Sequence, residues 1–166
     1  MIAWHRATVF AVAVVIVALG VWWLLGSRMP GQSARVGDAL RRLDPEVVAS
    51  GRAIYQANCA SCHGTKGEGA PNWKVRNPDD TLPPPPHDSS GHTWHHSDGL
   101  LYRIVHDGGK IYESPGFKSA MPPWGDRLTH EEIVAVVTYL KSLWDAEKQA
   151  VQEQVSRGDP FPNAGQ

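Results

Sequence analysis

An uncharged apolar run near the N-terminus is the longest hydrophobic feature of the chain. Residues 7–25 contain nineteen amino acids without a charge. At about 1.5 Å per residue a helix of this length measures about 28 Å, close to the roughly 30 Å hydrocarbon core of a bilayer. Trp4 precedes the run and Trp22 closes it, as in the aromatic belts of spanning helices. We expect a transmembrane anchor over residues 1–25. A cleaved signal peptide is the alternative, but its apolar region is shorter, roughly 7–15 residues.

Three later segments show apolar positions at helical spacing and carry recognisable helix starts. The first begins at Asp44, an N-cap residue followed by Pro45. The second covers residues 97–106 behind Ser97, and the third follows a capping box of Thr129 and Glu132. Their apolar stripes comprise Val47, Val48, Ile54 and Tyr55, then Leu100, Leu101, Ile104 and Val105, then Ile133, Val136, Val137, Leu140 and Trp144. The pattern predicts an all-α domain over residues 44–144.

The remaining segments lack a regular apolar pattern. Residues 26–43 are rich in Gly, Ser, Arg and Gln, which is typical of a tether. Residues 77–96 contain four consecutive prolines, which favour a stiff polyproline II stretch. The tail, residues 145–166, begins with good helix formers and then becomes polar. We expect the tail to fray or to dock on a larger complex, and the sequence does not decide between these outcomes.

Composition and charge exclude two classes of protein. The chain has 16 Lys and Arg against 17 Asp and Glu, so it lacks the basic excess of a nucleic-acid-binding protein. Its two Cys residues cannot form the framework of a small disulfide-stapled scaffold.

The two Cys residues stand in the sequence Cys59-Ala60-Ser61-Cys62-His63, the CxxCH attachment signature of c-type haem. Two thiols at this spacing can add to the two vinyl groups of one porphyrin, and the following His then lies beneath the iron. A thioredoxin-like CxxC, a zinc site and a structural disulfide are the alternatives. The first needs a preceding strand and the second needs further ligands at metal spacing.

Further segments on both sides of the motif resemble those of class I cytochromes c. After the CxxCH comes the loop of residues 67–72, and about sixty residues later Met121 is followed by Pro122. In that family the first and last helices cross where a small residue on one meets an aromatic on the other. Gly51 and Tyr55, facing Tyr139 and Leu140, match this crossing. The resemblance covers residues 44–144 and implies the class I cytochrome c fold.

The resemblance also implies a cofactor and its ligands. One covalent haem c would be attached to Cys59 and Cys62, with His63 and Met121 as axial ligands of the iron. The backbone carbonyl of Pro71 would accept the hydrogen bond from Nδ1 of His63, leaving Nε2 free for the metal. Met121 as a simple filler of the core is the alternative.

Location and function follow from the same resemblance. Arg6 precedes the apolar run and four Arg follow it, so the positive-inside count places the head in the cytoplasm. The family attaches its haem on the outer side of the membrane, and we therefore expect a periplasmic head on the bacterial inner membrane.

Such a protein is an electron carrier rather than an enzyme, and passes single electrons between redox partner proteins. A fixed subunit of an oxidase or quinol-oxidising complex is an alternative. Donor and acceptor are not specified by the sequence.

Four histidines within ten residues form a second feature: His87, His92, His95 and His96. Neutral imidazoles suit copper or zinc, so a metal-handling or sensing protein is a further alternative. We expect instead that these side chains shape the loop at the haem edge.

Overall fold

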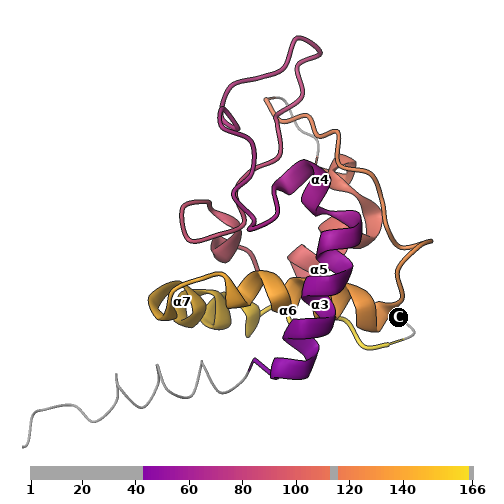
Figure 1. The fold of residues 1–166 in the computed structure, drawn as a ribbon, viewed down its shortest axis with the longest axis vertical. Helices are drawn as coiled ribbons and strands as arrows, with labels where there is room; N and C mark the ends of the chain where they lie inside the picture. The colour runs from indigo at the N-terminus through magenta and orange to yellow at the C-terminus, as the bar shows by residue number, and fades with distance from the viewer. Residues whose placement is uncertain (1–42, 113–115, 165–166) are drawn as a thin grey trace, which may run out of the picture. The chain divides into compact units, whose positions relative to one another are not determined.

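A computed structural model of the chain describes residues 43–112 and 116–164, which are mainly helical (Figure 1). The elements are α3 (Pro45–Asn58), α4 (Ala60–His63), η1 (Thr93–His95), α5 (Asp98–Asp107), η2 (Gly109–Tyr112), α6 (His130–Ser142) and α7 (Ala146–Ser156). No described residue lies in a β-strand, and Leu82 and Ser119 form an isolated bridge. The predicted all-α class is confirmed for this part of the chain.

The anchor expected at residues 1–25 and the tether up to residue 42 lie outside the described residues. Among the helices that are described, none has both the length and the apolar character needed to cross a bilayer.

The three helices predicted from their start signals begin where expected. The Asp44 carboxylate accepts a hydrogen bond from the Glu46 N–H at 2.8 Å, and Pro45 is the first helical residue of α3. Ser97 caps α5. Thr129 and the side chain of Glu132 form a reciprocal capping box at the start of α6. Local side-chain chemistry therefore sets these three starts, since each cap satisfies backbone N–H groups that the helix itself leaves unpaired.

The core lies where α3 crosses α6 (Figure 1). Tyr55 is 1% exposed, and its ring lies 5.2 Å from the ring of Tyr139. At Gly51 the two helices approach so closely that an added Cβ would lie 1.9 Å from the backbone oxygen of Ala135. The predicted crossing of a small residue and an aromatic against α6 is confirmed. The buried apolar cluster consists of Tyr55, Leu101, Val105, Ile133, Val136, Val137, Tyr139, Leu140 and Trp144.

The variant Gly51→Ala should destabilise the domain by about 2 kcal/mol net, because overpacking a close contact typically costs roughly 1–3 kcal/mol and this contact, which is to backbone, lies at the upper end. The gain in helix propensity, about 1 kcal/mol, opposes this cost but does not offset it. Urea unfolding of the variant measures the difference. Gly158→Ala is the matched control, since its added Cβ would meet only the Val155 oxygen, at 3.9 Å. Equal unfolding midpoints for wild type and Gly51→Ala would contradict the tight crossing.

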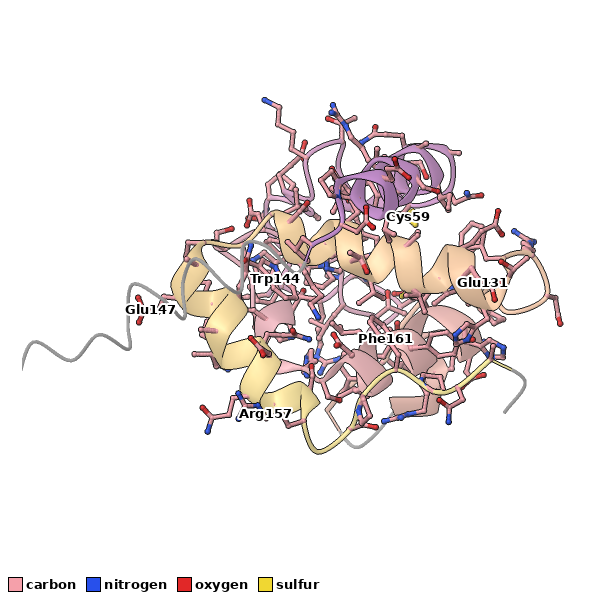
Figure 2. The ribbon with its side chains drawn as sticks, turned by 90° about the horizontal axis from the view of Figure 1, so that it is seen from below. Cys59, Glu131, Trp144, Glu147, Arg157 and Phe161 are labelled. Atoms are coloured by element: carbon pink, nitrogen blue, oxygen red, sulfur yellow. The ribbon has the colours of Figure 1, made fainter. Side chains whose placement is uncertain are left out.

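The tail was expected to fray or to dock on a larger complex. In the structure its helix α7 packs against the head, next to η1. Gln152 is fully buried, and its Nε2 donates to Asp98 Oδ1 at 2.8 Å and to the His96 oxygen at 3.2 Å. Figure 2 shows α7 between the labelled Glu147 and Arg157. Farther on, Phe161 packs against the core cluster. The packed unit therefore continues past residue 144. The sequence suggested a boundary there because polar side chains form much of the buried face of α7.

Candidate cofactor site

The CxxCH motif lies at the junction of α3 and α4. Cys59 ends α3, and its N–H donates to the Tyr55 oxygen at 2.8 Å. The His63 N–H in turn donates to the Cys59 oxygen at 2.9 Å, so the motif is wound into one helical turn. Both thiols are free. A helix precedes the motif, whereas a thioredoxin-like CxxC follows a strand.

A cavity of about 730 Å³ opens beside this turn. Cys59, Cys62 and His63 line it, and so does Met121 from the segment before α6. Cofactor sites of proteins are typically apolar cavities of roughly 300–1,000 Å³ with a few polar groups. The apolar part of the lining comes from residues far apart in the sequence: Trp73, Leu82, Pro83, Pro84, Pro85, Leu100, Leu101, Ile104, Phe117, Ala120, Pro122 and Trp124.

Met121 is held at the cavity by backbone contacts on both sides. Its carbonyl accepts a hydrogen bond from the Gly109 N–H at 3.1 Å, and its own N–H donates to Ser119 Oγ at 3.2 Å. The Trp124 N–H donates to the Val105 oxygen, which ties the segment to the end of α5. A second cavity, about 50 Å³, is lined by both Met121 and His63. The structure therefore places the predicted Met121 and His63 on the same space.

His63 is 8% exposed, and its Nδ1 lies 3.3 Å from the carbonyl oxygen of Pro85. Since a carbonyl can only accept, Nδ1 carries the proton and Nε2 is left as a lone-pair donor. Burial lowers the pKa of His63 and the bond to Pro85 opposes that shift, so the ring is neutral at pH 7.

The prediction that Pro71 accepts this hydrogen bond is wrong, because the acceptor is Pro85 and Pro71 is exposed. The Ala70 N–H donates to the Pro84 oxygen at 2.9 Å, which pairs the loop after the motif with residues 83–88, the proline segment. At Gly69, whose φ is 67°, an added Cβ would lie 2.4 Å from the Pro86 nitrogen. This close pairing places the proline segment, rather than the loop itself, against the His63 ring.

The Cys59 thiol is partly buried. Burial, with a smaller contribution from Cys62, raises its pKa to about 11. The thiol is therefore protonated at neutral pH, and it is not a reactive thiolate of the kind found in redox enzymes.

Each of the four clustered histidines has an aromatic neighbour. The His87 ring stacks on His63 with 4.2 Å between centroids. His92 stacks on Trp73 and lies edge-on to His96, while the ring of His95 lies 3.6 Å from that of Trp94. In the part of the chain that the structure describes, no three His, Cys, Asp or Glu side chains are grouped so as to hold a metal ion.

The stacking of His87 on His63 is a feature that the sequence analysis missed. Burial, followed by the charges of His63 and His92, holds the pKa of His87 well below its usual value. The only signal in the sequence was the position of His87 directly after four prolines.

Comparison with known proteins gives one family match. The family described as "Cytochrome C oxidase, cbb3-type, subunit III" matches residues 46–140, more than half of the chain. This match covers α3, the CxxCH motif, the proline segment, Met121 and most of α6.

Three curated relatives are similar over the same region. The "Cbb3-type cytochrome c oxidase subunit FixP" of Sinorhizobium medicae is 31% identical over 109 residues, which are 65% of this chain and 34% of the relative. The protein of the same name from Rhizobium meliloti is 29% identical over 111 residues, again 65% and 34%. "Cytochrome c6, chloroplastic" of Chlamydomonas reinhardtii is 33% identical over 100 residues, 60% of this chain and 57% of the relative. The match thus spans about a third of the two oxidase subunits. No solved structure matches significantly.

Proposed function

We propose, from the premise that this chain belongs to the cytochrome c family of cbb3-type oxidase subunit III, that it holds one covalent haem c and transfers single electrons. Cys59 and Cys62 would bind the porphyrin, and His63 and Met121 would ligate the iron. We further propose that residues 1–25 anchor the chain in the bacterial inner membrane with the head on the periplasmic side.

One observation carries this proposal: the two free thiols, the His63 ring and Met121 all line one apolar cavity of about 730 Å³. The cavity fits a haem in size and in polarity, and these side chains supply fitting donor atoms. Thiols two residues apart can each form a thioether, while a neutral imidazole and a thioether sulfur are the ligand pair of electron-carrying cytochromes c.

The bound haem would supply an iron that cycles between the ferric and ferrous states. His63 and Met121 would hold the iron between them, and small molecules would then have no free ligand position on it. The Pro85 carbonyl fixes the tautomer and the orientation of His63. Pro122, which has a fixed φ, stiffens the segment that presents the Met121 sulfur. The apolar walls would cover part of a bound haem and reduce its contact with water, which favours the ferrous form.

Two settings for this electron transfer are possible in chemical terms. A free-standing anchored carrier would use its tether to stay near membrane partners at a high effective concentration. Between Asp44 and Trp144 the sequence has twelve acidic and nine basic residues, so docking through an apolar haem edge is favoured over a basic ring. A fixed subunit of an oxidase complex is the second candidate, and the family description, subunit III, favours it.

A reduced-minus-oxidised visible spectrum of the purified full chain tests the proposal. We expect the sharp bands of a six-coordinate c-type haem, which remains attached after acid–acetone extraction because the bond is covalent. A chain without such bands would overturn the proposal. Purification in mild detergent then separates the two settings, since a carrier elutes alone and a subunit elutes with other chains.

Metal analysis separates the proposal from the copper or zinc alternative. We expect the wild-type protein to contain one iron per chain and no stoichiometric copper or zinc. The variant with His92, His95 and His96 all replaced by Ala should have the same metal content, with at most a modest shift of reduction potential. One copper per chain in the wild type, lost in the triple variant, would establish a second metal site instead.

A further inference from the structure

The proline segment, residues 83–88, contacts the His63 ring through two different groups. The Pro85 carbonyl accepts the hydrogen bond from Nδ1, and two residues later the His87 ring stacks on the imidazole at 4.2 Å with 30° between the planes. A single hydrogen bond to Nδ1 fixes one direction of an imidazole, but it leaves the ring able to tilt about that bond. A stacked ring limits this tilt.

His87 is itself held by three hydrogen bonds from different parts of the chain. Its N–H donates to the Gly67 oxygen at 2.6 Å, and its carbonyl accepts from the Trp144 indole N–H at 2.7 Å. Its Nδ1 lies 2.9 Å from Thr93 Oγ1. The backbone and the ring of His87 are therefore both fixed. The contacts come from Gly67 in the loop after the CxxCH motif, from Trp144 after α6 and from Thr93 in η1.

Thr93 determines how the His87 ring is oriented. Its hydroxyl, in a side chain that is 4% exposed, donates to the Pro86 oxygen at 3.3 Å. Since that proton is used, the hydroxyl oxygen accepts from Nδ1–H of His87. The ring of His87 thus cannot turn about its own axis without leaving a buried hydroxyl oxygen unpaired.

We propose that His87 is a positioning residue for His63: its stacked ring fixes the tilt of the His63 imidazole, and thereby the Nδ1–H bond to Pro85 and the reduction potential of the bound iron. This inference rests on the proposed function, because it takes His63 as an iron ligand. A well-aligned Nδ1–H bond makes the imidazole a stronger donor and favours ferric iron. Loss of alignment should therefore raise the potential.

The test compares four variants of the full-length haem protein. His87→Leu removes the planar ring but keeps an apolar side chain of similar size, and His87→Phe restores a planar ring. Thr93→Val keeps the shape at 93 and removes the hydroxyl, and with it the bond to His87 Nδ1 and the longer bond to the Pro86 oxygen. His95→Leu is the matched control, because His95 is exposed and stacks on Trp94.

The readouts are haem content, the g-values of the ferric haem in electron paramagnetic resonance and the reduction potential. We expect His87→Leu to shift the g-values and raise the potential, Thr93→Val to shift both in the same direction by less, and His87→Phe to return toward wild type. His95→Leu should match wild type. Should His87→Leu bind no haem, Thr93→Val decides the question by the same two readouts.

Wild-type g-values and potential in both His87→Leu and Thr93→Val would overturn the positioning role. A lower potential with unchanged g-values in His87→Leu would also overturn it, since His87 would then act by excluding water. These outcomes leave the proposed function intact. If the wild type itself carried no covalent haem, the proposed function would fail and this inference with it.

Discussion

The double variant Cys59→Ala, Cys62→Ala is expected to accumulate at less than a tenth of the wild-type level and to carry no haem. The reason is the size of the site. A cavity of about 730 Å³ lined by apolar side chains would be left in contact with water. Exposing so much apolar surface to water is a large loss for a domain, because an entire domain is stabilised by only roughly 5–15 kcal/mol. Relaxation of the walls lowers this cost but would also disrupt the α5 side of the core.

Haem staining after electrophoresis, together with immunoblotting of the membrane fraction, measures this prediction. The single variant Cys62→Ala should retain some haem, because Cys59 can still form one thioether. Ser61→Ala is the matched control within the motif, since Ser61 is exposed and its hydroxyl makes only a weak 4.0 Å contact with Cys62. Normal accumulation of a folded, haem-free double variant would argue against a haem domain.

The helix starts that the sequence predicts correctly have local causes. Asp44, Ser97 and Thr129 each cap the helix that follows directly, so their roles are determined within a few residues of chain. The α3–α6 crossing has no local cause, and it was predicted from the resemblance to class I cytochromes c, in which a small residue and an aromatic lie where the first and last helices cross.

The parts that were missed depend on contacts between distant segments. Any of several prolines could have offered a carbonyl to His63, and only the pairing of Ala70 with Pro84 selects Pro85. The docking of α7 was missed because Gln149, Gln152 and Ser156 form its buried face. Buried polar residues need specific partners, such as Asp98 for Gln152, and these partners are visible only in three dimensions.

Met121→Ala is expected to keep the haem covalently attached while opening the sixth coordination position. The two thioethers do not involve Met121, so haem content should stay near one per chain. Loss of the thioether sulfur should lower the reduction potential by on the order of 0.1 V, a modest part of the roughly 0.8 V range that axial ligands span. The ferrous form should then bind carbon monoxide, which the wild type should not.

Two controls make this result specific to the Met121 sulfur. Met29→Ala removes a methionine from the expected tether and should leave spectrum, potential and carbon monoxide binding unchanged. Ser119→Ala removes the acceptor of the Met121 N–H, so it tests whether the backbone of this segment must be held for the sulfur to reach the iron.

An unchanged spectrum in Met121→Ala would mean that another side chain lining the cavity supplies the sixth ligand. His92 and His96 line the same cavity, and a bis-histidine iron would have a lower potential than a His–Met iron already in the wild type. The wild-type potential and the variant's carbon monoxide spectrum together therefore identify the ligand.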